Sequence, residues 1–225
     1  MQQIYSHLDI NGQYLPFPAG KVVCIGQNYA DHIAELNSVK RPEPLFFIKP
    51  NSALCAVEAS FEIPKHSGVC HNELELAVLI SKPLKNVTPE HVNAGIWGYG
   101  LALDLTLREV QSKLKKQGRP WELAKGFDGA CPISPFINKS EIEFPQDIDL
   151  QLTVNGQSRQ KGNTKDMIRG INQLISQMSQ YFTLMPGDVV LTGTPAGVGP
   201  LKCGEKLELS LSSAKSNWQF NSTVR

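Results

Sequence analysis

Strand-like runs outnumber helical runs in this chain, and the two do not alternate. The apolar and β-branched runs cover residues 21–25, 45–48, 74–80, 98–105, 150–154, 189–192 and 206–211. Helical patterns are few and cover residues 29–36, 107–117 and 166–182. For the last helix, Asn163 or Thr164 is the expected N-cap. Because a doubly wound sheet needs a helix between successive strands, this order predicts a mixed or antiparallel α+β fold.

The size and composition of the chain indicate one globular domain over residues 1–225. It has 225 residues, 41% of them hydrophobic and 19% charged, without an internal repeat or linker-like stretch. The net charge of +1 argues against electrostatic recruitment to nucleic acid. No apolar run is long enough to span a membrane, and the start lacks a signal-peptide pattern. Five widely spaced cysteines without a CxxC motif favour reduced thiols, so we expect a cytoplasmic protein.

The segment HNELELAVLI, which begins at His71, is the most informative one. Strand alternation would place His71, Glu73 and Glu75 on one face. Two carboxylates on the face of a strand that enters a core repel each other and are costly to desolvate, so they require a cation, a shared proton or an arginine. The alternative is a strand edge with two solvated glutamates.

A third carboxylate, Asp104, ends the apolar segment GYGLALD. It is either the N-cap of the following helix, a role open to Thr106 as well, or a metal ligand. Together with Glu73 and Glu75 it offers only hard oxygen atoms, which suit Mg²⁺, Mn²⁺ or Ca²⁺ better than Zn²⁺.

The segment GQNYADHIAELNS places His32 and Glu35 three residues apart, on one face of a short helix. Glu35 would orient His32 and raise its basicity, as an acid/base pair requires. The alternative is an ordinary exposed pair on a helix surface.

Two lysines and two basic or glycine-rich segments leave similar choices. Lys125 is either a solvated loop charge or a group that binds an anion or polarises a carbonyl beside a metal-bound substrate. For Lys49, the apolar approach FFI favours a buried or cleft-facing amine. The glycines of TGTPAGVGP would let the backbone approach a ligand, although the spacing of a phosphate loop is missing. We expect the basic run at residues 113–119 to be a solvated helix end.

Six segments in this order resemble the fumarylacetoacetate hydrolase family, especially its small single-domain acylpyruvate hydrolase branch. They are GQNYADH, PLFFIKP, HNELELA, GYGLALDLTLREVQ, WELAKGFDGACPISP and PGDVVLTGTPAGVGP. The resemblance covers nearly the whole chain, and the E-x-E motif with a downstream aspartate is its most specific part.

The resemblance implies a mixed β-sandwich or β-roll with few short helices, a homodimer, and one Mg²⁺ or Mn²⁺ per subunit. It also implies a role for each of ten residues. The metal ligands fall on Glu73, Glu75 and Asp104, the acid/base dyad on His32 and Glu35 of a helical lid, the active-site lysine on Lys125, and the substrate-binding positions on Lys49, Arg108, Gln111 and Thr194.

The activity that this resemblance implies is metal-dependent hydrolysis of a carbon–carbon bond in acylpyruvate-type diketo acids. His32 would activate water, and the metal and Lys125 would stabilise the pyruvate enolate. Two other reactions fit the same site: decarboxylation of oxaloacetate and keto–enol tautomerisation or isomerisation. A divalent-cation-binding domain without catalysis is a further alternative, although metal binding alone does not require His32 and Glu35.

Overall fold

The computed structural model describes residues 5–36, 42–58, 60–64 and 68–225. Its largest sheet has eight strands in the order β2-β1-β12-β5-β6-β8-β3, with β9 also paired to β6. The strands are β1 (Val22–Gly26), β2 (Leu45–Lys49), β3 (Leu54–Ala56), β5 (Leu74–Ile80), β6 (Ile96–Leu103), β8 (Cys131–Ile133), β9 (Ile137–Asn138) and β12 (Val189–Leu191). The pairs β1–β12 and β3–β8 are parallel and the others antiparallel, which confirms the mixed α+β prediction.

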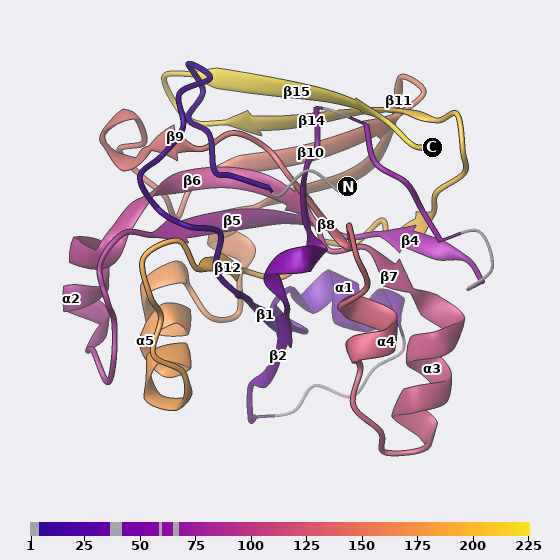
Figure 1. Cartoon of the computed structure of the whole chain (residues 1–225), viewed down its shortest axis with the longest axis horizontal. Helices are drawn as coiled ribbons and strands as arrows, with labels where there is room; N and C mark the ends of the chain where they lie inside the picture. The colour runs from indigo at the N-terminus through magenta and orange to yellow at the C-terminus, as the bar shows by residue number, and fades with distance from the viewer. Residues whose placement is uncertain (1–4, 37–41, 59, 65–67) are drawn as a thin grey trace.

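Two smaller sheets complete the β structure of the described residues. A four-stranded antiparallel sheet runs in the order β11-β10-β14-β15 and covers one face of the large sheet (Figure 1). A three-stranded sheet has the order β13-β4-β7. These strands are β4 (Cys70–Asn72), β7 (Thr106–Leu107), β10 (Asp149–Val154), β11 (Gln157–Asn163), β13 (Gly199–Pro200), β14 (Lys206–Ser212) and β15 (Asn217–Thr223).

The helices are short and lie at the periphery of the large sheet. They are α1 (Ala30–Glu35), α2 (Pro89–Val92), α3 (Arg108–Lys116), α4 (Glu122–Lys125) and α5 (Ile171–Tyr181). Helices α2 and α5 pack together at one end, and α3 and α4 pack together at the other (Figure 1). No helix within the described residues is both long and apolar enough to cross a membrane.

Strand β5 is buried on both faces, and this explains its nearly continuous apolar sequence. Leu76 and Val78 belong to the core between the large sheet and the four-stranded sheet, whereas Ala77 and Leu79 belong to a second core on the opposite face. Glu75 has the same strand parity as Ala77, so it points away from the four-stranded sheet.

The helix predicted over residues 166–182 begins only at Ile171. The residues before it bond to a distant part of the chain instead. Met167 forms an isolated β-bridge with Tyr29, and the Ile168 N–H donates to the carbonyl of Asn28. The Asn163 side chain accepts from the Lys165 N–H, so it caps a separate 3₁₀ turn rather than the α-helix. Backbone pairing over a distance along the chain has therefore overridden the local helical pattern.

Candidate metal centre and active site

Antiparallel pairing of β5 and β6 brings three acidic residues together. Glu73 directly precedes β5, Glu75 lies within it, and Asp104 directly follows β6. The Asp104 N–H donates to the Glu73 carbonyl at 2.8 Å, so the two residues lie opposite each other. One carboxylate oxygen from each of the three residues lies within 4.8 Å of the others, and all three side chains are buried.

This burial decides two questions that the sequence leaves open. Glu75 is only 1% exposed, so the interpretation of solvated glutamates at a strand edge is wrong. Helix α3 begins at Arg108 with Leu107 in the N-cap position and without a side-chain cap, so Asp104 is not a helix cap. The Thr106 hydroxyl is not a cap either, because it donates to the Asp104 carbonyl.

Two of the three carboxylates are paired with cations that also line the site. Lys125 Nζ donates to Glu73 Oε2 at 2.8 Å and to Asp104 Oδ2 at 2.5 Å, and Arg108 donates to Glu73 Oε1. Burial opposes ionisation of Glu73, but the charges of Lys125 and Arg108 outweigh it and hold its pKa well below the usual range. Burial also disfavours the Lys125 ammonium, but Asp104 and Glu73 raise its pKa above the ordinary lysine value.

Glu75 is the carboxylate without a cationic partner among the described residues. Its Oε2 accepts a hydrogen bond of 2.6 Å from the Gly193 N–H. Burial, followed by the charges of Asp104 and Glu73, raises the pKa of Glu75 well above its usual value. A hard divalent cation would relieve this repulsion, and buried carboxylate oxygens are the ligands that Mg²⁺ and Mn²⁺ prefer. The donor set of Glu73, Glu75 and Asp104 therefore fits such a cation.

Lys49 lies behind Asp104 and does not line the cavity of the site. Its fully buried Nζ lies 2.7 Å from Asp104 Oδ1. It donates to the carbonyl of Lys125, to that of Ala130 at 2.9 Å and to that of Leu105 at 3.5 Å. Its three N–H donors thus bond backbone carbonyls, and its charge faces Asp104. This arrangement corresponds to the buried amine that the preceding apolar run favours.

His32 and Glu35 form a pair on α1, and His32 lines the same cavity as the three acidic residues. His32 Nδ1 and Glu35 Oε2 are 3.2 Å apart, and Glu35 Oε1 accepts from the Gly197 N–H at 3.0 Å. His32 is 6% exposed and lines the cavity, whereas Glu35 is exposed, so only the glutamate resembles a member of an ordinary helix-surface pair. Because Nδ1 is held by Glu35, Nε2 of His32 remains available for proton transfer.

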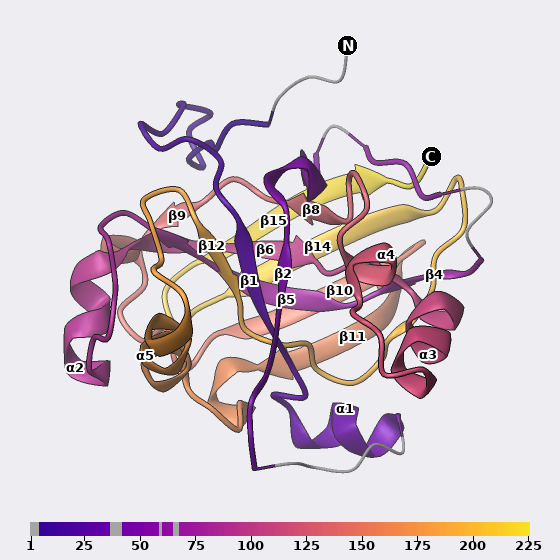
Figure 2. The ribbon, with the colours of Figure 1, turned by 60° about the horizontal axis from the view of Figure 1, so that its bottom comes forward.

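One cavity of about 60 Å³ gathers most of the residues that the sequence singles out. Figure 2 shows α1, α3 and α4 on the lower right side of the molecule, and each of these helices contributes residues to the cavity wall. Eight of the ten predicted residues line it: His32, Glu73, Glu75, Asp104, Arg108, Gln111, Lys125 and Thr194. Glu35 and Lys49 do not line the cavity, but they contact the lining residues His32 and Asp104, respectively.

Several cavity residues are absent from the sequence-based prediction. They are Ile25, Gly26, Gln27, Leu36, Leu45, Phe47, Lys115 and Trp121. Phe47 and Trp121 have their rings 6.0 Å apart, and Lys125 Nζ lies 5.1 Å from the Phe47 ring centroid. Lys115 is exposed, as expected for the basic run at residues 113–119, and it also lines the cavity. Helical spacing was the available signal, because Arg108, Gln111 and Lys115 share one face of α3.

A family model described as "Fumarylacetoacetate (FAA) hydrolase C-terminal" matches residues 21–221. The chain belongs to this family. The match spans the acidic residues, α1 and the loop that contains Gly193, which are the parts that build the cavity.

Three relatives that are each named for a reaction match most of this chain. Oxaloacetate tautomerase YcgM of Escherichia coli is 53% identical over 92% of this chain and 95% of its own length. A mitochondrial oxaloacetate decarboxylase of Dictyostelium discoideum is 40% identical over 91% of this chain and 94% of its own. The structure of fumarylpyruvate hydrolase from Pseudomonas aeruginosa, in complex with Mn²⁺ and pyruvate, aligns with a TM-score of 0.90 and 32% identity, covering 100% of this chain and 97% of that one.

Proposed function

We propose that this chain is an oxaloacetate tautomerase, which interconverts the keto and enol forms of oxaloacetate with the aid of a divalent cation. The observation that carries the proposal is the cavity itself, in which three buried carboxylates, a buried histidine and a buried lysine face the same small volume. The bacterial relative at 53% identity, an oxaloacetate tautomerase, supports this reaction over acylpyruvate hydrolysis.

Glu73, Glu75 and Asp104 would hold Mg²⁺ or Mn²⁺ in this proposal. When bound, such a cation would supply Lewis acidity, which favours the loss of a proton from the carbon next to the 2-oxo group. The cavity walls keep this end of the substrate in a largely buried environment, where electrostatic interactions are stronger than in water.

His32 is the proposed acid and base. With Nδ1 held by Glu35, Nε2 would remove a proton from C3 of the keto form, and the electron pair of the C–H bond would become the enolate. Protonation of the enolate oxygen then gives the enol. The reverse sequence returns a proton to C3, so the proton count balances without an added reactant.

Lys125 is the proposed stabiliser of the enolate oxygen. An ammonium group has three N–H donors, and two of those of Lys125 bond Glu73 and Asp104. The third is available to the oxygen on which negative charge develops, and a fixed donor in a buried site is effective because it needs no reorganisation.

Acylpyruvate hydrolysis is the second candidate function. The relative described as a fumarylpyruvate hydrolase with Mn²⁺ and pyruvate favours it, because cleavage of an acylpyruvate releases a pyruvate enolate, which the same groups would stabilise. In this reaction His32 would take its proton from water rather than from carbon. Decarboxylation of oxaloacetate is a third candidate reaction, because it also forms an enolate that these groups would stabilise. It depends less on His32.

The experiment that tests the proposal compares three reactions of the purified protein with Mg²⁺. These are enol–keto interconversion of oxaloacetate by ultraviolet absorbance, release of pyruvate from oxaloacetate, and loss of acetylpyruvate. We expect interconversion to be the fastest. His32→Ala should slow it by about 10²- to 10⁴-fold, the usual contribution of a general base. His91→Ala, which changes an exposed histidine on α2, is the control. Turnover of acetylpyruvate without any effect on oxaloacetate would establish the hydrolase instead.

A further inference from the structure

Among the described residues, three cations line the cavity, and two of them are already paired. Arg108 donates to Glu73 and to Gln111, and Lys125 donates to Glu73 and Asp104. The ammonium group of Lys115 has neither a hydrogen bond nor an ion pair within the part of the chain that the structure describes. Lys115 is therefore the cavity cation whose charge remains available to a ligand.

The geometry of α3 directs Lys115 toward the other polar residues of the cavity. Arg108, Gln111 and Lys115 are separated by three and four residues, so they lie on one face of the helix. The Cα atoms of Arg108 and Lys115 are about 10 Å apart along the axis, at 1.5 Å per residue. Helical side chains lean toward the N-terminus of their helix, so the ammonium group of Lys115 extends back toward Gln111 and Arg108.

Gln111 adds a second unsatisfied donor on this face. Its Oε1 accepts a hydrogen bond of 2.7 Å from Arg108, which fixes the amide orientation. The amide NH₂ group then faces away from Arg108 and has no partner among the described residues. A positive charge and an amide donor thus lie side by side along the wall that leads away from the acidic centre.

We propose that Lys115 determines substrate specificity by binding the second carboxylate of a dicarboxylic 2-oxo acid. The 2-oxo carboxylate end lies at Glu73, Glu75 and Asp104, and the distal carboxylate extends along α3 to Lys115. This inference rests on the proposed function for the orientation of the substrate. It goes further because it names Lys115 of α3 as the residue that distinguishes dicarboxylic from monocarboxylic substrates.

The alternative is that Lys115 is an ordinary solvated lysine in the last turn of α3, where a positive charge also favours the helix dipole. The helix supplies a matched control for this alternative. Lys116 is the next residue, shares the last turn and is also exposed, but it does not line the cavity. A general effect of charge on the helix would appear equally in variants of Lys115 and Lys116.

The test is a binding measurement with two ligands that cannot enolise. N-oxalylglycine carries a second carboxylate, and N-ethyloxamate has a methyl group in its place. Dissociation constants are measured by calorimetry on the full-length protein loaded with Mn²⁺, for wild type, Lys115→Met, Lys115→Arg and Lys116→Met. Repeating the titrations at higher salt tests whether the preference is electrostatic.

We expect wild type to prefer N-oxalylglycine, and Lys115→Met to weaken this ligand by roughly 5- to 20-fold while N-ethyloxamate binding is unchanged. Lys115→Arg should keep most of the preference, and Lys116→Met all of it. Equal losses for both ligands in Lys115→Met, or none for either, would overturn the inference. Because neither ligand reacts, a preference that depends on Lys115 can be found even if oxaloacetate is not interconverted, so the two proposals fail separately.

Discussion

The acidic centre combines residues of opposite charge in a way that only the folded chain reveals. Lys125, Arg108 and Lys49 surround Glu73 and Asp104, whereas the one hydrogen bond of the Glu75 carboxylate within the described residues comes from the Gly193 N–H. The sequence identifies the three carboxylates because an apolar strand rarely carries two of them. It does not reveal that Lys49 forms a buried ion pair with Asp104, because the proximity of residues 49 and 104 depends on long-range packing.

The first prediction concerns metal binding by the three carboxylates. Glu73→Gln and Asp104→Asn should each weaken Mn²⁺ binding by more than the roughly 10- to 100-fold typical of residues that only support a ligand. The measurement is a Mn²⁺ titration followed by electron paramagnetic resonance. Glu35→Gln serves as the control, since Glu35 contacts His32 and Gly197 rather than the acidic centre. Wild-type affinity in Glu73→Gln would show that this carboxylate is not a ligand.

The second prediction concerns the stability provided by Lys49. Lys49→Met should lower the free energy of unfolding by about 3–5 kcal/mol, because Asp104 loses a buried charge partner and three carbonyls lose a donor. Urea unfolding measures this difference. Lys116→Met, at an exposed position, should change stability by no more than about 0.5 kcal/mol. A similarly small change in Lys49→Met would contradict the supporting role.

At the level of the elements, the long apolar strands were predictable from the sequence, whereas the two-residue strands were not. Strand β5 has the predicted bounds, because seven buried residues in a row leave a strong local signal. The two-residue strands β7 and β13 exist only through pairing with β4, so the local sequence does not indicate them. Helix α5 begins late for the same reason, since Met167 and Ile168 bond the segment that precedes α1.

The third prediction concerns α1, the helix that carries the dyad. Six residues are too few to form a stable helix alone, so α1 depends on the contacts of Ile33, His32 and Glu35. We expect its amides to exchange faster without ligand than with Mg²⁺ and oxalate, as measured by hydrogen exchange and mass spectrometry. The amides of α5, which packs against α2, serve as the internal reference. Equal exchange of α1 under both conditions would argue against a lid that becomes ordered over the substrate.

The fourth prediction concerns the loop that contains Gly193. This residue has φ of +94°, and a Cβ there would lie 2.6 Å from the Cβ of Asn28. Gly193→Ala should therefore destabilise the protein by about 1–3 kcal/mol and weaken Mn²⁺ binding through Glu75. Gly156→Ala is a matched control, because Gly156 also has a positive φ of +77° but has open space around it. A smaller loss of stability in Gly193→Ala than in Gly156→Ala would refute the steric argument.

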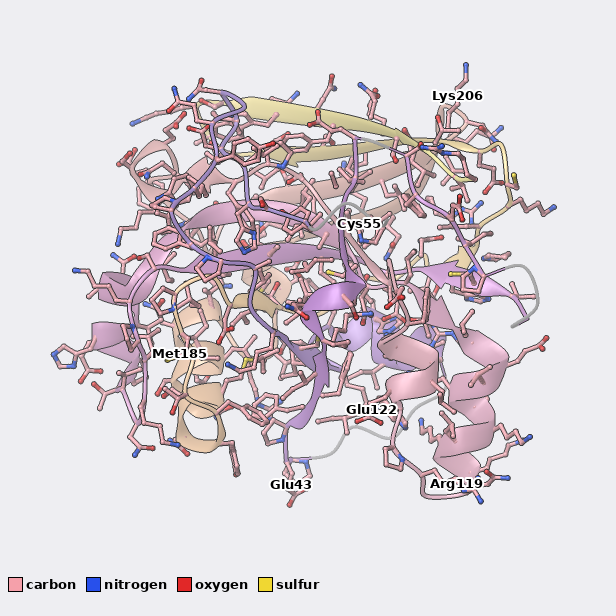
Figure 3. The ribbon with its side chains drawn as sticks, in the orientation of Figure 1. Glu43, Cys55, Arg119, Glu122, Met185 and Lys206 are labelled. Carbon is pink, nitrogen blue, oxygen red and sulfur yellow. The ribbon has the colours of Figure 1, made fainter. Side chains whose placement is uncertain are left out.

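At the scale of the whole molecule, the cavity lies between the large sheet and the helices α1, α3 and α4. In Figure 3, Glu43, Glu122 and Arg119 lie in the lower half of the view, whereas Lys206, at the start of β14 in the four-stranded sheet, lies at the top. The four-stranded sheet thus covers one core, and α1, α3 and α4 surround the cavity. The fold class was predictable from the order of strand-like runs, but this division between a structural side and a site side follows from the register of β5 and β6.

The fifth prediction concerns assembly. The family resemblance leads us to expect a homodimer with one Mg²⁺ or Mn²⁺ per subunit. Light scattering coupled to size-exclusion chromatography should give about twice the chain mass of 24.8 kDa. Metal analysis of the same fraction should give one ion per chain. A single-chain mass at micromolar concentration would refute the dimer without affecting the site within each chain.

The central claim is that the acidic cavity uses a divalent cation to interconvert the enol and keto forms of oxaloacetate. The most direct test is the rate at which enol oxaloacetate loses its ultraviolet absorbance after rapid mixing with the protein. Wild type should accelerate this loss with Mg²⁺ and should return to the background rate with a chelator, and Glu73→Gln should stay at the background rate with Mg²⁺. Acceleration that is equal in wild type and Glu73→Gln, or that is absent from wild type with Mg²⁺, would contradict the account.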